Sequence, residues 1–400
     1  MIAEATTTKV VIVGGGLQGC ASAYFLRDCP GVEVTIVERT AIGAAASGKG
    51  GGFLAKNWGS GPTKALHEQS FELHSELANR LGVESYRRIS TLEVTSELGL
   101  REWPPKPVAT KPIKRSALHP KWLDASDTKS RLMDHDTAQV MPLELCEKLF
   151  AASGASLVAS AARGLRVEDG RCVGVRTDDG LVPADQVVVA MGAWSVLLED
   201  WLPGAAVPME GVYSTSVVYD AVDDVRDEPF ALFCAEDSNA CHLECYPRPD
   251  GSIYLCGIGG SQHVYGPRLR EGGDLQDASK MKANPGRVEA AHASFSKMAP
   301  AFADKTPRIT QACMRPCAPD ALPLLGKFDP ALGLPDNLIL ATGHNCWGIL
   351  WAPITGKLVA DLILGNTPSV DLAPFSPGRF ISRPPRRGRA MVNQPVGEQW

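Results

Sequence analysis

Residues 9–49 read KVVIVGGGLQGCASAYFLRDCPGVEVTIVERTAIGAAASGK. The apolar, β-branched run at residues 10–13 predicts a short buried strand of the parallel type. Residues 20–26 then predict a helix, and residues 32–37 predict a second β-branched strand. Strand, helix and strand in this order form a βαβ unit, so this stretch predicts a parallel sheet with helices packed on it.

Three glycines mark the passage from the first strand into the helix. Gly14, Gly16 and Gly19 have the spacing G-x-G-x-x-G. The first permits a tight turn, the second lets the backbone approach a pyrophosphate, and the third lets helix and strand pack closely. The N-terminus of the helix offers phosphates free N–H groups and the positive end of its dipole.

Glu38 ends the second strand and is placed to bind the ribose hydroxyls of a nucleotide. An acid at this position disfavours NADP and leaves NAD and FAD open. The alternative is a βαβ packing turn that binds no nucleotide. The strand, the helix and the acid together favour the nucleotide.

The composition of the whole chain limits its function. Its 400 residues, 44% hydrophobic and 21% charged, are typical of a soluble globular protein with two or three domain-sized units. A net charge of −5 gives no electrostatic basis for binding nucleic acid. Apolar runs such as residues 186–190 and 338–341 are too short to span a bilayer. We expect no signal peptide, a cytoplasmic location, and eleven cysteines that are mostly buried free thiols rather than zinc ligands.

A small-residue loop and a second glycine turn follow later in the chain. Residues 40–61 are rich in glycine, alanine and serine, and we expect them to bring backbone N–H groups close to a ligand. Residues 185–190 predict another buried strand, followed by Gly192 and Trp194, which indicates a return to the nucleotide-binding sheet. A third glycine turn precedes the last predicted helix. Helices are predicted at residues 63–81, 142–152, 285–298 and 353–364.

Residues 207–260 differ from the rest, because alternating strands and turns predict an antiparallel second domain. Period-two spacing puts His242, Glu244 and Tyr246 on one face of a strand, and a solvated face is the alternative to a ligand-binding one. Residues 103–122 predict a surface loop or lid, or a plain connector. The Arg- and Pro-rich tail, residues 381–400, is predicted to be disordered.

In this order the glycine turns resemble those of the D-amino-acid oxidase superfamily of flavoproteins, of the glycine oxidase and sarcosine oxidase type. The resemblance covers roughly residues 8–380 and implies an α/β fold. A Rossmann-like FAD domain would be assembled from residues 8–85, 135–205 and 311–380. An interleaved antiparallel substrate domain would comprise residues 86–134 and 206–310. The matching stretches are VVIVGGGLQG with IVER, GAAASGKGGGF, VVVAMGAWS, YPRPDGSIYLCGIGG, CMRPCAPDALPLLG, ATGHNCWGILWAPITGKLVADLI and VDLAPFSPGRF.

The resemblance implies FAD as the cofactor, with no metal ion. The first glycine turn would hold the pyrophosphate, and Glu38 with Arg39 would hold the adenosine ribose. The last glycine turn would place backbone N–H groups beside the flavin pyrimidine ring. The implied FAD-binding residues are Gly14, Gly16, Leu17, Gln18, Gly19, Glu38, Arg39, Ser47, Gly48, Lys49, Gly50, Gly192, Trp194, Cys313, Gly343, His344, Gly348 and Ile349.

Cys313 raises the question of a covalent flavin. It stands seven residues before Asp320, the spacing at which sarcosine oxidase-like members attach the flavin through a cysteine. The intervening Arg-Pro resembles glycine oxidase, whose flavin is not covalent. Non-covalent FAD is favoured, and a covalent bond through Cys313 stays open.

The same resemblance implies an activity. Arg315 matches the arginine that binds the substrate carboxylate, and a guanidinium does so in a bidentate manner. The expected reaction is FAD-dependent oxidation of the C–N bond of a small amino or imino acid. Hydride would pass from Cα to flavin N5, and the imine would then be hydrolysed. O₂ or another electron acceptor would reoxidise the flavin. The candidate catalytic residues are Arg315, His344, Glu244 and Tyr246.

Several residues depart from the family pattern. Cys346 replaces an arginine of glycine oxidase, and the lysine that assists oxygen reduction in sarcosine oxidase is replaced near Leu255. A dehydrogenase that uses another acceptor therefore stays open. Glu244 replaces a substrate-contacting tyrosine and would favour a cationic or hydroxylated substrate. His344 could tune the flavin, carry a proton or serve only as a structural hydrogen-bonder. The alternative functions are a non-catalytic flavoprotein acting in assembly or trafficking, and oxidation of a hydroxy acid or polyol.

Overall fold

The computed structural model describes residues 7–96 and 118–382. Most of the predicted loop or lid at residues 103–122 lies outside these residues. So does the predicted disordered tail, apart from the last two residues of helix α10 (Arg379–Ser382).

Within the described residues, six strands form one sheet in the order β19-β20-β12-β1-β2-β8. All neighbours are parallel except β19, which pairs antiparallel with β20 at the edge. The sheet confirms the strands predicted at residues 10–13 and 32–37 and the return of the chain at residues 185–190. The strands are β1 (Thr8–Val13), β2 (Val32–Glu38), β8 (Ser156–Ala159), β12 (Gln186–Val189), β19 (Leu324–Lys327) and β20 (Leu338–Thr342).

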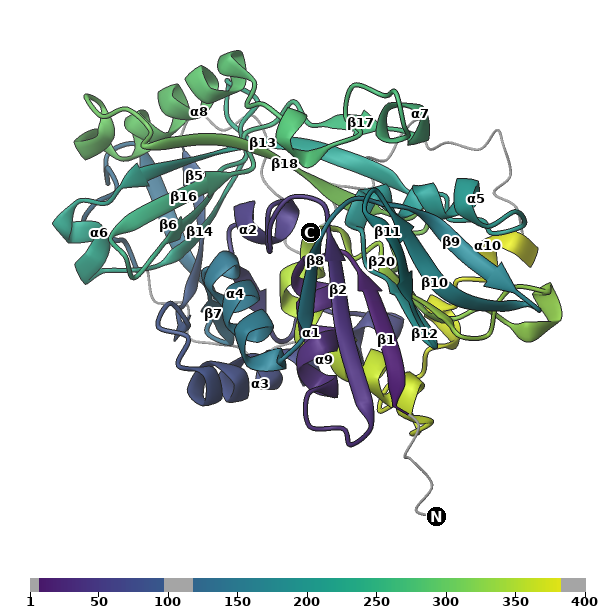
Figure 1. Ribbon diagram of the computed structural model, residues 1–400. Helices are drawn as coiled ribbons and strands as arrows, with labels where there is room; N and C mark the ends of the chain where they lie inside the picture. Colours follow the sequence, from purple (N-terminus) through teal and green to yellow (C-terminus); the bar gives the residue numbers. More distant parts are fainter. Residues whose placement is uncertain (1–6, 97–117, 383–400) are drawn as a thin grey trace.

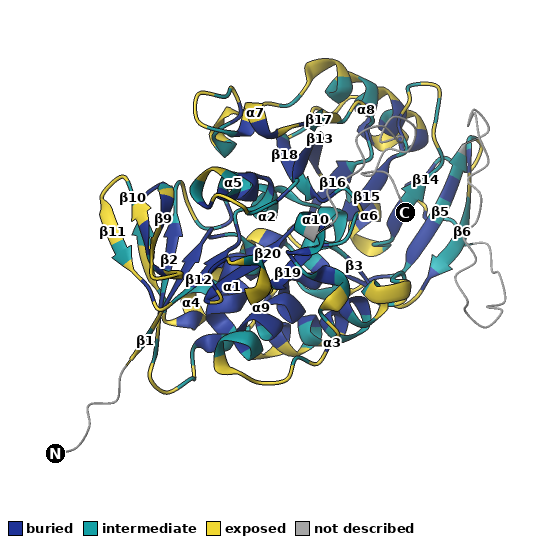
Figure 2. Cartoon of the chain, turned by 90° about the vertical axis from the view of Figure 1, so that its right-hand side faces the viewer, coloured by how far each residue is buried: buried dark blue, intermediate teal, exposed yellow. Residues whose placement is uncertain are grey.

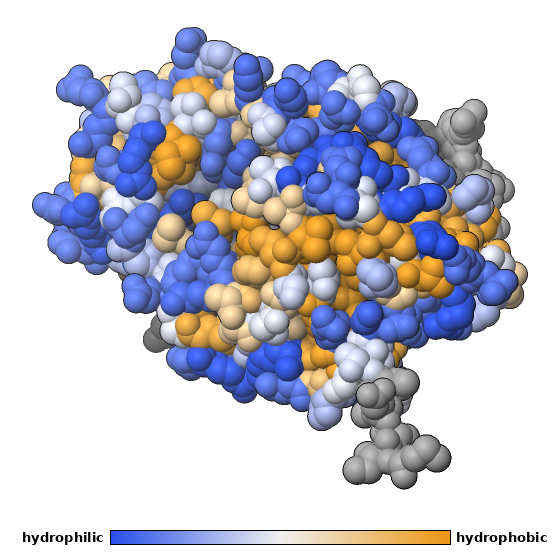
Figure 3. All heavy atoms as spheres, in the orientation of Figure 1, coloured by the Kyte–Doolittle hydropathy of each residue, from blue (hydrophilic) through white to orange (hydrophobic). Residues whose placement is uncertain are grey.

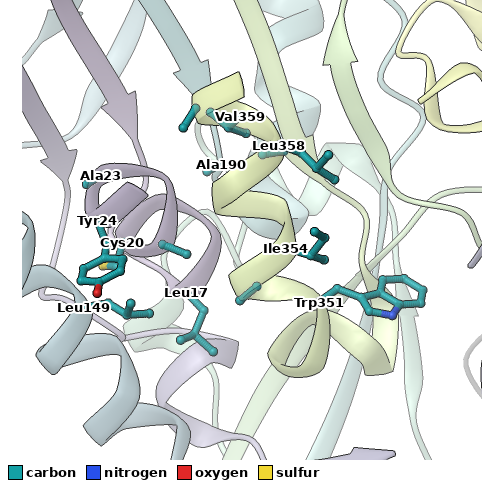
Figure 4. Packing of buried hydrophobic residues seen from close by; sticks show 14 of the residues in the cluster. Leu17, Cys20, Ala23, Tyr24, Leu149, Ala190, Trp351, Ile354, Leu358 and Val359 are labelled. Carbon is teal, nitrogen blue, oxygen red and sulfur yellow. The ribbon is translucent and has the colours of Figure 1, made fainter. Parts of the chain in front are cut away.

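Helices α1 and α9 pack on this sheet, and together with α3 and α4 they form the core of what we call the cofactor half. Helix α1 packs between α9 and α4, and α3 packs on α9. Figure 4 shows Tyr24 of α1 beside Leu149 of α4, with Trp351, Ile354 and Leu358 of α9 in the same buried apolar cluster. In Figure 2 helices α1 and α9 are mostly dark blue. The four helices are α1 (Leu17–Leu26), α3 (Lys64–Leu81), α4 (Pro142–Ser153) and α9 (Gly348–Leu364).

Helix α9 begins five residues earlier than predicted and contains Pro353. A proline has no N–H to donate to the carbonyl four residues before it, which here belongs to Ile349. That carbonyl accepts a hydrogen bond from Nε2 of His74 at 3.0 Å, and Oγ of Ser70 donates to the Leu350 carbonyl at 2.5 Å. Side chains of α3 therefore donate hydrogen bonds to these buried carbonyls and allow the helix to continue through the proline.

Helix α9 and the turn before it, Asn345–Leu364, are long and apolar enough by length and composition to cross a membrane. This segment was not predicted from the sequence, because Thr355, Lys357 and Asp361 interrupt its apolar run. Its large side chains Trp351, Ile354 and Leu358 lie fully buried against α1 and α3. This burial is that of a core helix.

A second sheet of eight described strands forms what we call the substrate half, above the first sheet in Figure 1. One neighbouring pair, β14 with β5, is parallel, so the predicted antiparallel domain contains one parallel contact. Strand β18, which opens the third predicted FAD segment, pairs with β13 along its whole length. The strands are β5 (Thr91–Ser96), β6 (Thr128–Asp134), β13 (Glu210–Asp220), β14 (Ala231–Cys234), β15 (Glu244–Pro247), β16 (Ser252–Cys256), β17 (Gln262–Val264) and β18 (Ile309–Cys317).

The remaining elements connect and cover the two sheets. Figure 3 shows a band of apolar surface across the middle of the face seen in Figure 1, over β8 and the neighbouring small sheet β9–β11. These elements are β3 (Phe53–Ala55), β4 (Arg87–Arg88), β7 (Thr137–Gln139), β9 (Ala162–Glu168), β10 (Arg171–Thr177), β11 (Gly180–Pro183), α2 (Ala46–Lys49), α5 (Leu198–Trp201), α6 (Asp223–Asp227), α7 (Gly266–Leu269) and α8 (Pro285–Met298).

Candidate active site

A cavity of about 300 Å³ lies between the two halves, a volume typical of small-molecule and cofactor sites. Its walls include all three glycine turns of the cofactor half and strands β13, β15, β16 and β18 of the substrate half. Gly16 and Gly192 line this same cavity, and Gly343 is flanked by two residues that do, Thr342 and His344.

The first glycine turn has the geometry that its spacing predicts. Gly14 has φ +114°, and a Cβ there would lie 2.4 Å from the Ala190 carbonyl oxygen of the neighbouring strand. A Cβ on Gly19 would lie 2.0 Å from the carbonyl oxygen of Gly14. The N-cap of α1 is Gly16, which has no side chain to cap the helix, and Ser47 Oγ accepts from the Leu17 N–H at 2.9 Å. Open backbone N–H groups at a helix N-terminus fit a pyrophosphate.

The acid of the motif lines one end of the cavity. The two carboxylate oxygens of Glu38 accept from the backbone N–H groups of Gly15 at 2.8 Å and Thr40 at 2.9 Å. Arg39 Nη1 donates to the Gln276 carbonyl at 2.6 Å, and Trp194 Nε1 donates to the Leu275 carbonyl at 3.0 Å. These contacts hold residues 275–278 of the substrate half against the end at which adenosine is expected.

Hydrogen bonds join the three turns to one another. Thr342 Oγ1 donates to the Gly192 carbonyl at 2.8 Å, and Gln18 Nε2 donates to the Gly348 carbonyl at 2.7 Å. Segments far apart in the sequence thus form one wall. The other expected cofactor residues that line the cavity are Leu17, Ser47, Gly50, Cys313, His344 and Ile349.

Four expected cofactor residues support the wall from outside the cavity lining. Gly19 and Gly343 allow close packing or a positive φ at the turns. A Cβ on Gly48 would lie 2.2 Å from the Gly43 carbonyl oxygen. Lys49 Nζ donates to the Ala312 carbonyl at 3.3 Å, which ties α2 to β18. The structure therefore places Lys49 at a strand backbone.

At the other end, β15 and β16 present a buried carboxyl. His242, Glu244 and Tyr246 all line the cavity, so this face of the strand is not solvated. Oε2 of Glu244 accepts hydrogen bonds from the Tyr246 hydroxyl and, at 3.4 Å, from Cys256 Sγ. Burial raises the pKa of Glu244, and the two donors and the charges of His242 and Arg315 oppose that rise. The carboxyl is only 4% exposed.

Arg315 enters the cavity from β18, opposite Val212 of β13. A guanidinium stays charged at all ordinary pH values. Around it lie three cavity-lining groups, Cys313, Cys346 and Glu244, and in each case its positive charge opposes the rise in pKa that burial causes. The thiol of Cys313 is 9% exposed and, because burial raises its pKa, protonated at neutral pH.

His344 lies in the last glycine turn and is 1% exposed. Its Nε2 lies 3.0 Å from Thr355 Oγ1, and burial lowers its pKa to about 3. A proton carrier needs a pKa near the working pH. The neutral, hydrogen-bonded ring therefore favours the structural alternative for His344.

Comparison with known proteins agrees with this geometry. Residues 9–362 match the family model described as "DAO: FAD dependent oxidoreductase". The chain belongs to the DAO family of FAD-dependent oxidoreductases. It is 29% identical to a glycine oxidase of Pseudomonas aeruginosa over 388 residues, covering 92% of this chain and 98% of the relative. In fold it resembles glycine oxidase from Geobacillus kaustophilus (TM-score 0.74, 23% identity, 93% and 99% of the two chains) and L-proline dehydrogenase from P. horikoshii (0.74, 19%, 94% and 98%).

Several cavity residues of this DAO-family site were not predicted from the sequence. Phe53 of β3 stacks on Tyr246 with ring centroids 5.4 Å apart, and Tyr246 stacks on Tyr254 at 6.2 Å. Trp347 lines the cavity from the last turn. Together they form an aromatic wall. The hairpin turn at residues 249–251 could have indicated that Tyr254 and Cys256 lie opposite Tyr246 and Glu244, because the turn fixes the register.

Proposed function

We propose that this protein is an FAD-dependent oxidase or dehydrogenase that oxidises the C–N bond of a small amino or imino acid. The observation that carries the proposal is the position of Arg315, whose guanidinium lies in the same cavity as the glycine turns. A lasting positive charge in a partly closed site fits a substrate carboxylate. The similarity to a glycine oxidase over nearly the whole chain supports the same class of substrate.

When bound, FAD would supply the hydride acceptor for this reaction. The backbone of Gly14–Gln18 would hold its pyrophosphate, Glu38 its ribose, and the turn at residues 343–349 its flavin ring. Arg315 would fix the carboxylate, so that Cα has one orientation towards the ring. The aromatic wall would exclude water from the substrate. It is formed by Phe53, Tyr246, Tyr254 and Trp347.

Anaerobic reduction of the flavin tests this function. Addition of small amino and imino acids to the flavin-loaded protein under nitrogen should bleach the flavin absorbance, and Arg315→Ala should slow the bleaching greatly. Bleaching by hydroxy acids or polyols alone would assign the chemistry to C–O bonds. No bleaching with any member of the panel, together with a stable protein partner in a pull-down, would favour a role in assembly or trafficking.

The linkage of the flavin and the location of the protein belong to the same proposal. We favour non-covalent FAD, with the covalent bond through Cys313 as the alternative. The electron acceptor is O₂ or another oxidant. A cytoplasmic location is supported by the eleven cysteines, all of them free. Even Cys20 and Cys146, whose sulfurs lie 3.6 Å apart, are not joined.

A further inference from the structure

The ionisable groups at the substrate end of the cavity include a guanidinium and a carboxyl, which carry charges of opposite sign. Arg315 approaches from β18 and Glu244 from β15, and the positive charge of Arg315 opposes the rise in the pKa of Glu244 that burial causes. The proposed function uses only Arg315. A buried carboxyl in a ligand cavity is costly unless its charge is balanced, so Glu244 calls for a function of its own.

The surroundings of Glu244 define what it can bind. Among the described residues, the donors to its carboxyl, Tyr246 and Cys256, both reach Oε2. Burial raises the pKa of both donors, so both keep their protons and continue to donate. These bonds orient the carboxyl and leave Oε1 as an acceptor for a ligand.

The charge of Glu244 favours a cation at this position. A carboxylate makes a charge-assisted hydrogen bond to an ammonium, which is roughly twice as strong as a neutral one. The neighbouring rings bound the position: Phe53 and Tyr254 stack on Tyr246, and Arg248 lies over the Tyr254 ring at 5.0 Å. A hydroxyl or a methyl group at the same position would interact with the carboxylate much more weakly.

We propose that Glu244 is the binding group for the substrate nitrogen in its cationic form, so that the site selects zwitterionic amino or imino acids over hydroxy acids and plain carboxylates. Arg315 would take the carboxylate and Glu244 the ammonium, and each charge of the ligand would meet its opposite. This inference rests on the proposed function, because it takes the carboxylate site of Arg315 as given.

Three ligands of nearly equal shape test the proposal. In 2-aminoisobutyrate, 2-hydroxyisobutyrate and pivalate, an ammonium, a hydroxyl or a methyl group occupies the same position, and the first cannot lose hydride because it has no Cα–H. Isothermal titration of the flavin-loaded protein should give at least about tenfold tighter binding of the ammonium ligand than of the other two, as expected for a charged hydrogen bond.

Two glutamine variants make the test specific. Glu244→Gln should remove the preference for the ammonium without weakening the binding of pivalate, which also shows that the variant is folded. Glu210→Gln changes another buried carboxyl of the substrate half, one that pairs with His263 and is not part of the cavity lining, and should keep the full preference.

The possible results distinguish the role of Glu244 from the proposed function on which it rests. Equal binding of all three ligands by the parent protein, or a preference that survives in Glu244→Gln, overturns the role of Glu244 and leaves the carboxylate site standing. If none of the three ligands binds, the carboxylate site fails, and the proposed role of Glu244 fails with it.

Discussion

The two ends of the cavity are built from different parts of the chain. The cofactor end consists mainly of backbone: glycine turns, a helix N-terminus and carbonyl groups joined by short hydrogen bonds. The substrate end consists of side chains on strands, namely Glu244, Tyr246, Tyr254, Cys256 and Arg315. A backbone site depends on shape and tolerates few changes of glycine, whereas a side-chain site can be altered one residue at a time. The cofactor site therefore tolerates few substitutions, whereas the substrate site can be altered by single substitutions.

The largest effect is expected at the cofactor end, from Gly14→Ala. This change adds a Cβ that would lie 2.4 Å from the Ala190 carbonyl oxygen, at a φ of +114°. The turn must shift, so we expect protein that is purified without flavin and with a clearly lower Tm. Flavin content by absorbance and thermal unfolding measure the two effects.

Gly31→Ala is the matched control. Gly31 also has a positive φ, +73°, but no atom of the described residues lies within 4 Å of a Cβ built there. It should lose about 1 kcal/mol of stability and keep its flavin. A Gly14→Ala protein as yellow and as stable as the Gly31→Ala protein would contradict the backbone cradle.

At the substrate end, Arg315→Ala should leave the flavin content unchanged and lower the rate of flavin reduction by low concentrations of substrate at least about 100-fold. The variant loses the partner of the carboxylate and keeps the fold. Stopped-flow reduction under nitrogen measures the rate. An unchanged rate, or a loss of flavin together with the rate, would erase the distinction between the two ends.

A fall in pH should destabilise the cofactor half before the substrate half. Burial lowers the pKa of His67 and His74 to about 4 and that of His344 to about 3, and all three lie in that half. The unfolded chain binds protons at these sites below pH 6.5 that the folded chain does not, so stability falls as the pH falls. The loss between pH 6.5 and pH 5 is about 2 kcal/mol for each histidine.

Urea unfolding at the two pH values, followed by flavin release, measures this loss. His74→Gln provides the comparison, because a glutamine amide can still donate to the carbonyls of α9 and does not titrate. Its loss between pH 6.5 and pH 5 should be smaller by about 2 kcal/mol. Equal losses in the two proteins would show that His74 does not contribute.

The smallest effect is expected at Cys313. With non-covalent FAD, acid precipitation should release all the flavin into the supernatant, and Cys313→Ser should have the same flavin content as the parent. Fluorescence that remains with the precipitated parent protein, and disappears in Cys313→Ser, would establish the covalent bond instead.

The sequence predicted the cofactor half better than the substrate half for a physical reason. The first turn and its acid lie within 25 consecutive residues, from Gly14 to Glu38, and each glycine has a backbone role that can be read from spacing alone. The start of α9 could not be predicted, because the bonds that allow Pro353 inside the helix come from Ser70 and His74 on another helix. Residues 276–278 and Phe53 reach the cavity only through tertiary packing.

In the substrate half, alternation along one strand predicted the shared face of His242, Glu244 and Tyr246. It could not show that this face is buried, because burial depends on the opposite wall. The parallel contact between β5 and β14 was also beyond the sequence pattern, since the two strands are separated by more than one hundred residues.

The central claim is that the flavin and the amino acid share one cavity, and the absorption spectrum of the flavin-loaded protein tests it most directly. Titration with 2-aminoisobutyrate should shift the flavin bands, with the same dissociation constant that calorimetry gives. Arg315→Ala should raise the dissociation constant in both measurements. A flavin spectrum that stays unchanged while calorimetry shows the ligand to be bound would place the two molecules in different sites and contradict the account.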